Sequence, residues 1–361
     1  MWLRLGESEY RNMISKREYN LDFLRIAACF MVILLHTSAQ NWDSVPFTSF
    51  EWMAFNTYNS SVRSAVALFF MLSGKLFLSK ETLSFKPLFL RNILKLLFVY
   101  GLWSLLYAID TIGILNILNN FDLHRFASVT IASKYHLWYL PELISVYLML
   151  PVLFAVKYYQ NGKILNYICI MIFLFTIVRS SILLFVDSTL LTTLSRKVNF
   201  SLGSCCGYFI LGYVLDQNKG KLRKIKTPVL LFSFAALVGI TATGAYLDSA
   251  AKGAASGDLY NDIFITTCFE AIVLFTLFLR VPSENINEQM GLWLQKISKY
   301  TFFVYLIHPF ILEHLKSLFL LHTLSFNPWL STPIIAVGTF LVSMCIARII
   351  DMMPGLNKFL L

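Results

Sequence analysis

The stretch "LRIAACFMVILLHTS", residues 24–38, is apolar enough to lie inside a lipid bilayer, yet it carries Arg25 near one end and His36 near the other. The whole chain of 361 residues is similarly apolar: 57% of its residues are hydrophobic, only 14% are charged, and the mean hydropathy is +0.65. This composition excludes a soluble globular protein. The hydrophobic runs lack the alternation of a porin-like barrel. The sequence therefore predicts an all-α integral membrane protein, a polytopic bundle of about ten transmembrane helices.

The hydrophobic segments and their short connections predict a single domain. No connection is large enough for a second folded domain, so we expect one transmembrane domain over residues 21–352, with cytoplasmic tails at 1–20 and 353–361. The N-terminal tail is polar and lacks the apolar core of a cleavable signal peptide. We expect the longest outer connections, 41–61 and 109–135, to be loops that partly cover an extracytoplasmic cavity. The ten segments are 21–40, 62–79, 88–108, 136–156, 164–186, 201–215, 228–247, 262–281, 301–321 and 333–350.

The distribution of Lys and Arg sets the expected orientation. When the connections are assigned alternately to two sides, one side holds 19 of the 30 basic residues and the other holds 7, while four lie within helices. Both termini fall on the basic side, so we expect both to be cytoplasmic. Topology thus explains the net charge of +10, and we expect no nucleic-acid partner. The six cysteines lie inside apolar segments without metal-ligand spacing, and we expect no metal site.

Arg25 and His36 share one face of their predicted helix. Eleven residues make three turns plus roughly 20°, so the two side chains project from the same face about 16.5 Å apart along the axis. Asp22 and Gln40 fall on nearly the same stripe. An ionisable group within a membrane is costly unless it faces protein or water, so we expect this stripe to line an interior cavity. The alternative is that Arg25 snorkels to the headgroups while His36 makes a structural hydrogen bond.

A second group of polar residues lies in "KYHLWYLPELISVYLMLP", residues 134–151. His136 and Trp138 open a predicted helix near the outer interface, and Glu142 and Tyr147 lie progressively deeper. An aromatic belt at the membrane surface explains Trp138 without any function. Glu142 is harder to explain, because a carboxylate inside a span needs a partner.

A third group lies in "SKYTFFVYLIHPFILEHL", residues 298–315, which contains His308, Pro309 and Glu313. Proline frees a backbone carbonyl within a helix, and one interpretation is that His308 only satisfies that carbonyl. Arg63 begins the predicted second span, where it either faces the cavity or anchors the interface.

These blocks, in this order, resemble the acyltransferase-3 family of bacterial membrane acyltransferases. The resemblance rests on Arg25 and His36, on "FFMLSGKLFL" in the second span, on "HLWYL" at the start of the fourth, and on "YLIHP" near the C-terminus, and it runs from about residue 20 to residue 350. The compact chain is similar to the branch that O-acetylates surface polysaccharides or their lipid-linked precursors.

One departure concerns the charge cluster before the third span. The family commonly carries Arg-x-x-Arg there, whereas "FLRNILKLL" places Asn92 and Lys95 at that spacing, with Arg91 adjacent. Positive charge is retained, but bidentate Arg geometry at both positions is not.

The resemblance implies a bacterial inner-membrane enzyme that takes an acyl group, most commonly acetyl, from cytoplasmic acyl-CoA. The acceptor would be a hydroxyl of a surface polysaccharide, a lipid-linked glycan or a similar extracytoplasmic molecule. No tightly bound cofactor is expected, because acetyl-CoA is a co-substrate. His36 would act as the general base, and a transient acyl-histidine stays open. Donor phosphates would be held by Arg25, Arg91 and Lys95, while the expected cavity or acceptor-side residues are Asp22, Arg63, His136, Trp138, Glu142, Tyr147, His308 and Glu313.

Two other functions stay open from the sequence. A transporter of polysaccharide or of a small molecule also carries polar residues within its helices. Transporters often have two interrupted helices in corresponding positions, whereas only "YLIHPF" is clearly interrupted here. A non-catalytic sensor or scaffold would have no need of both Arg25 and His36. The sequence also leaves a homo-oligomer open.

Overall fold

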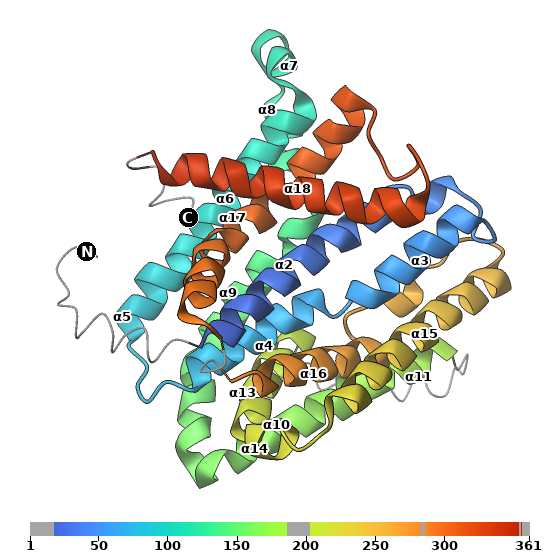
Figure 1. The fold of residues 1–361 in the computed structure, drawn as a ribbon. Helices are drawn as coiled ribbons and strands as arrows, with labels where there is room; N and C mark the ends of the chain where they lie inside the picture. The colour runs from blue at the N-terminus through green and yellow to red at the C-terminus, as the bar shows by residue number, and fades with distance from the viewer. Residues whose placement is uncertain (1–17, 186–202, 283–285, 354, 356–361) are drawn as a thin grey trace.

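In a computed structural model the chain is described at residues 18–185, 203–282, 286–353 and 355. Most of the two expected tails therefore lies outside the described residues. The described part of the chain is helical and contains no β-strand (Figure 1), as an all-α membrane protein requires.

Nine helical stretches in the described residues are long and apolar enough to cross a membrane. The prediction of a polytopic all-α membrane protein is confirmed. These stretches are Tyr19–Ser44, Phe50–Leu78, Phe85–Ile112, Tyr135–Tyr158, Lys163–Phe185, Thr227–Lys252, Asp258–Arg280, Glu288–Phe319 and Pro328–Asp351.

Several of these stretches are built from more than one helical element. Two contain a π-helical segment, η2 in the third and η5 in the fifth. The elements are α2 (Tyr19–Ala39), η1 (Trp42–Ser44), α3 (Phe50–Val62), α4 (Ala65–Leu78), α5 (Phe85–Pro87), η2 (Leu88–Ile93), α6 (Leu94–Ile112), α7 (Ile114–Asn119), α8 (Leu123–Ala132), η3 (Tyr135–Trp138), α9 (Tyr139–Tyr158), η4 (Tyr159–Gly162), α10 (Lys163–Ile172), η5 (Phe173–Val178), α11 (Arg179–Phe185), α13 (Ser204–Gln217), α14 (Lys219–Leu222), α15 (Thr227–Lys252), η6 (Asp258–Tyr260), α16 (Ile265–Arg280), α17 (Glu288–Phe319) and α18 (Pro328–Asp351).

Helix α13 corresponds to the predicted sixth segment, whose first two residues lie outside the described residues. It packs against α4 so closely that glycine is required at the contact. A Cβ on Gly74 would stand 1.7 Å from the carbonyl oxygen of Phe209, and one on Gly212 would stand 1.9 Å from that of Met71. Small residues allow two helix backbones to approach in this way.

Helix α2 begins, and helix α18 ends, on the same side of the bundle. The Arg25 guanidinium, near the start of α2, donates to the Ser298 hydroxyl at 3.2 Å. The ammonium of the next residue, Lys299, lies 2.6 Å from Asp351 at the end of α18. We call this side of the bundle the basal end. The opposite side, where α2 ends and α9 begins, is the apical end.

The second span differs from the prediction. It begins at Phe50 and consists of α3 and α4, which meet at Arg63 and Ser64. The prediction that residues 41–61 form a connecting loop is therefore wrong for 50–61. Asn56 and Asn59 are polar but fully buried, so their low hydropathy conceals a helix that faces the protein interior.

The predicted outer connection 109–135 is also more helical than expected. Helix α6 continues to Ile112, and α7 and α8 follow it. These two short helices project beyond the neighbouring helices (Figure 1). Asp122 caps α8 by accepting a hydrogen bond from the backbone N–H of Arg125 at 3.1 Å.

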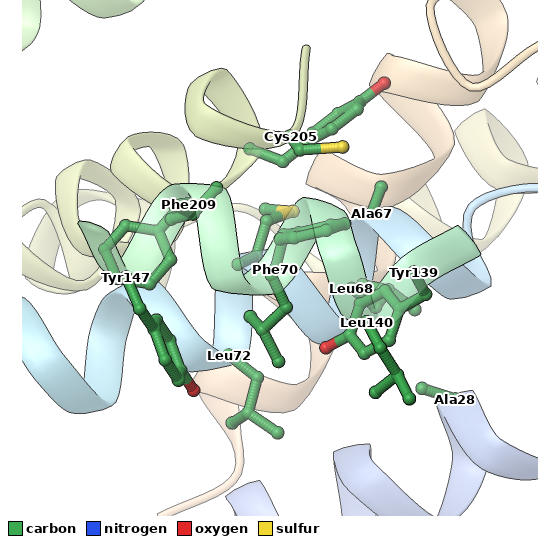
Figure 2. Close-up of a cluster of buried hydrophobic side chains, with 14 of the residues drawn as sticks. Ala28, Ala67, Leu68, Phe70, Leu72, Tyr139, Leu140, Tyr147, Cys205 and Phe209 are labelled. Atoms are coloured by element: carbon green, nitrogen blue, oxygen red, sulfur yellow. The ribbon is translucent and has the colours of Figure 1, made fainter. Parts of the chain in front are cut away.

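The core lies where α2, α4, α9 and α13 meet. Figure 2 shows Phe70 and Leu72 of α4 beside Tyr139 and Tyr147 of α9. The Phe70 and Tyr139 rings stand 4.9 Å apart, centroid to centroid. Helix α2 packs on one side of this core and also contacts α3, α16, α17 and α18, so side chains on several faces of α2 meet protein.

Candidate active site

Three histidines from distant parts of the sequence meet inside the apical half of the bundle. The His36 ring, from the last turns of α2, lies stacked on the His308 ring of α17, with centroids 5.3 Å apart and an interplanar angle of 25°. The His136 ring, from η3, stands 5.4 Å from His308. The Tyr135 ring lies 5.0 Å from the His36 ring, centroid to centroid. We call His36, His136 and His308 the histidine cluster.

Proline explains the position of His308. Pro309 has no backbone N–H, so the carbonyl of Tyr305, four residues earlier, lacks its usual helical donor. The Nδ1 atom of His308 lies 2.7 Å from that carbonyl oxygen. Because a carbonyl only accepts, Nδ1 must carry the proton, and Nε2 is left as an acceptor. The structural interpretation of His308 is correct, but it accounts for only one of the two ring nitrogens.

His136 is likewise held by a backbone carbonyl of α17. Its Nε2 lies 3.2 Å from the carbonyl oxygen of Leu306, which also accepts a 2.8 Å hydrogen bond from the Tyr107 hydroxyl. The Tyr305 hydroxyl donates to the carbonyl of His136 itself. These bonds join α6, η3 and α17 around the bend. They also fix the proton of His136 on Nε2 and leave Nδ1 as an acceptor.

The two remaining acceptors are buried. His136 and His308 are 1% and 0% exposed, and neither Nδ1 of the first nor Nε2 of the second has a hydrogen-bond partner among the described residues. A buried acceptor without a donor is costly, which favours occupation by a proton-bearing group. The N–H of His36, a water molecule or a substrate hydroxyl has the required chemistry.

Arg25 and His36 both contact α17, the first at Ser298 and the second at His308. The two residues therefore lie on the same face of α2. This is the shared face that their spacing predicts. Asp22 accompanies Arg25, with its carboxylate 3.8 Å from the guanidinium. The Arg25 side chain keeps 33% of its surface exposed.

Arg63 stands at the break between α3 and α4 and turns toward the apical side. Its guanidinium donates to Asn59 and, at 3.2 Å, to the carbonyl of Tyr260. It also covers the Tyr260 ring at 4.4 Å from the centroid. Arg63 lies near enough to His36 for an electrostatic interaction between them. Its contacts with Asn59 and Tyr260 direct it to the protein interior rather than to lipid headgroups.

The other residues singled out from the sequence lie elsewhere. Glu313 pairs with Lys134 at 2.7 Å on the apical side. Tyr147 is buried in the core beside Phe77. Trp138 and Glu142 are exposed, which fits the aromatic-belt interpretation for Trp138, and the Glu142 carboxylate interacts with Cys205 of α13. Arg91 and Lys95 are also exposed, at the basal start of the third span.

Several residues at the site had no signal in the sequence. Tyr107, Tyr135 and Tyr305 surround the histidine cluster, but tyrosine is common in membrane helices and no spacing marks these three.

Lys75, away from the histidine cluster, does carry a signal: it follows the apolar run of α4, is 2% exposed, and pairs with Asp216 of α13 at 3.3 Å. Counting it among the residues of a basic connection concealed its buried position.

The described residues contain no group of three or more His, Cys, Asp or Glu side chains arranged to hold a metal ion. Within the histidine cluster, one nitrogen each of His136 and His308 is already bonded to a backbone carbonyl. The free nitrogens of His136 and His308 can accept protons and hydrogen bonds.

The fold and the site together define a polytopic helical membrane protein with ionisable side chains gathered inside the bundle, a property of membrane enzymes and transporters alike. The family model of the acyltransferase-3 acyltransferase domain matches residues 18–348. The chain belongs to this family of membrane acyltransferases. No curated protein and no solved structure matches it in the same comparisons.

Proposed function

We propose that this protein is an O-acyltransferase of the bacterial inner membrane, with both termini in the cytoplasm. It moves an acyl group, most commonly acetyl, from cytoplasmic acyl-CoA to a hydroxyl of a surface polysaccharide, its lipid-linked precursor or a similar extracytoplasmic acceptor. The observation that carries this proposal is the position of His36. It contacts His308 and Tyr135 inside the bundle, on the same face of α2 as Arg25.

The donor would enter from the basal end. Coenzyme A has an anionic nucleotide at one end and a long arm that carries the thioester at the other. Arg25 suits the phosphates, since its guanidinium is partly open and is a strong partner for phosphate oxygens. The thioester would then meet His36 about 16.5 Å further along the helix. Arg91 and Lys95, exposed at the basal end, add positive charge for the same phosphates.

The reaction needs one proton to move twice. A nitrogen of His36 takes the proton of the acceptor hydroxyl as its oxygen attacks the thioester carbonyl. The C–S bond breaks, and the departing thiolate takes that proton from the imidazolium, so the products are an ester and free coenzyme A. An acyl-histidine that is then transferred to the acceptor stays an alternative route. A small turn of its ring would let His36 donate its single N–H to one of the nearby acceptors, on His136 or His308, which would then orient the ring.

One observation favours transport as a second candidate. The span formed by α3 and α4 is interrupted between them, which makes it the second interrupted span, in addition to α17 with its internal proline. Discontinuous helices line many transport sites. Transport predicts no thioester turnover, so an assay of thioester cleavage separates the two functions.

The experiment that tests the proposal in cells is mass spectrometry of surface glycans. We compare a strain without this chain with the same strain complemented by the wild-type chain, by His36→Gln or by His124→Gln. His124 is an exposed histidine of α8 and serves as the matched control. We expect an acyl mass increment, 42 Da per group for acetyl, with the wild-type chain and with His124→Gln, and none with His36→Gln. An increment with His36→Gln would remove the base assignment, and none with the wild-type chain would remove the proposed acceptor class.

A further inference from the structure

A polar hollow opens on the apical side next to the histidine cluster. Its volume is about 640 Å³, within the range of small-molecule sites. Segments far apart in the sequence form its walls: the last turn of α2 with η1, the α3–α4 break, the end of α11, and the connection around η6. Its lining residues are Ala39, Trp42, Asp43, Asn59, Arg63, Leu184, Gly257, Asp258, Tyr260 and Asn261.

The hollow lies close to the proposed base. Ala39 follows His36 by three residues, and residues at this spacing are neighbours on a helix surface. Arg63 lies in the wall of the hollow and also interacts electrostatically with His36. A molecule held in the hollow therefore has one end near the histidine cluster and the other at the apical surface.

One wall of the hollow is an aromatic surface held in place by other rings. The Trp42 ring packs on Trp52 at 4.5 Å and meets Tyr260 edge-on at 5.3 Å. Trp52 is fully buried, whereas Trp42 keeps part of its surface open. The C–H face of a sugar ring is apolar and slightly positive, which suits the negative face of an aromatic ring.

The polar atoms around this surface suit hydroxyl groups. Asn59 and Asn261 contribute amides, and Asp43 contributes an exposed carboxylate that pairs with no cation among the described residues. Amides donate and accept, while a carboxylate accepts from sugar hydroxyls. This combination of one aromatic face with a few polar groups is typical of a site that orients a small polar ligand.

The charges of the hollow argue against an anionic ligand. Lys252 beside it is occupied by Asp258 at 2.5 Å and Asp248 at 2.8 Å. The Arg63 guanidinium donates to Asn59 and to the Tyr260 carbonyl, and Asp43 and Asp258 lie in the same lining and oppose its charge. A carboxylate on the ligand would therefore meet one lining cation and two lining anions, of which Asp43 pairs with no cation among the described residues.

We infer that this hollow binds one neutral sugar residue of the acceptor glycan, stacked on Trp42, with a hydroxyl directed toward His36. The inference rests on the proposed function and names its acceptor site. The hollow would set which sugars are modified, because hydroxyl-bearing rings without negative charge fit it best.

The test is sugar binding to the purified full-length protein in detergent without any acyl donor, so that its outcome does not depend on thioester turnover. Three probes are titrated: methyl glucoside, methyl N-acetylglucosaminide and methyl glucuronide. Binding is followed by ligand-observed saturation-transfer NMR, which reports on every variant. The variants are Trp42→Ala, Trp42→Phe, which keeps a ring, and Trp329→Ala, a half-buried apical tryptophan of α18 outside the hollow as the matched control.

We expect at least one neutral glycoside to bind more tightly than the glucuronide. Trp42→Ala should weaken that binding about tenfold, the loss typical of a central aromatic contact, while Trp42→Phe recovers part of it and Trp329→Ala changes nothing. Equal or tighter binding of the glucuronide, unchanged binding by Trp42→Ala, or no binding of any of the three sugars by the wild-type protein would overturn the inference. None of these results alters the test of the proposed function, which rests on His36.

Discussion

The rings of His36 and His308 lie stacked 5.3 Å apart, although 272 residues separate them in the chain. His308 holds its position through the carbonyl that Pro309 leaves free at Tyr305. His308 thus has two roles: its imidazole satisfies the carbonyl that Pro309 leaves free, and it lies beside the proposed base.

This dual role can be separated by a double substitution. His308→Ala leaves the Tyr305 carbonyl without a donor and should cost about 1–3 kcal/mol of stability. Adding Pro309→Ala restores a backbone N–H to that carbonyl, so the double variant should regain thermal stability in detergent while acyl transfer stays low. Recovery of both stability and activity would mean that His308 serves the backbone alone.

Arg25 is the proposed partner of the donor phosphates. Arg25→Ala should weaken acetyl-CoA binding about tenfold or more, since a charge-assisted contact to phosphate is lost. Arg125→Ala, an exposed arginine of α8 at the apical side, is the matched control and should bind normally. Isothermal titration calorimetry on the purified proteins measures both. Unchanged affinity in Arg25→Ala would assign Arg25 to its contacts with Asp22 and Ser298 alone.

The contact between α4 and α13 predicts that the effect of a Gly→Ala substitution on stability depends strongly on its position. Gly74→Ala should destabilise the protein markedly, because the added methyl would overlap the Phe209 carbonyl at 1.7 Å. Gly239→Ala, inside α15 with nothing within 4 Å, should be neutral or stabilise by about 0.5–1 kcal/mol. Melting temperatures in detergent compare the two. Equal melting temperatures would show that the helices can separate without cost.

The orientation in the membrane is tested at two exposed positions. Ser128→Cys in α8 should react with an impermeant maleimide in intact cells, because the connection after α6 is expected outside. Lys224→Cys, after α14, should react only after lysis. The opposite pattern would invert the topology and place the proposed donor entry on the wrong side.

The spans could be predicted because long apolar runs report directly on membrane helices. Helix α3 could not: Asn56 is buried and donates to the Ala242 carbonyl at 2.9 Å, so a polar residue satisfied by the protein looks like part of a loop. High hydropathy marks helices that face lipid. A helix that faces the protein interior can be polar, so a hydropathy profile does not reveal it.

The site was predictable within one helix but not between helices. The spacing of Arg25 and His36 fixes their shared face, because helical periodicity is local. The meeting of His36 with His136 and His308 depends on how α2, η3 and α17 pack, and no periodicity carries that information. The sequence also predicts that Glu142 needs a partner; the residue lies exposed in the first turn of α9, where its partner, Cys205 of α13, comes from a helix that periodicity does not identify.

The most direct test of the central claim is turnover of radiolabelled acetyl-CoA by purified wild-type protein and by His36→Gln, with His124→Gln as the control. Glutamine keeps a hydrogen bond but cannot accept a proton at neutral pH, so we expect transfer to a glycan acceptor, or slow hydrolysis, to fall by about 10²–10⁴-fold in His36→Gln. Binding of acetyl-CoA should persist, since Arg25 is about three turns away. Wild-type turnover by His36→Gln would contradict the role of His36, and no thioester turnover by the wild-type protein would contradict acyl transfer itself.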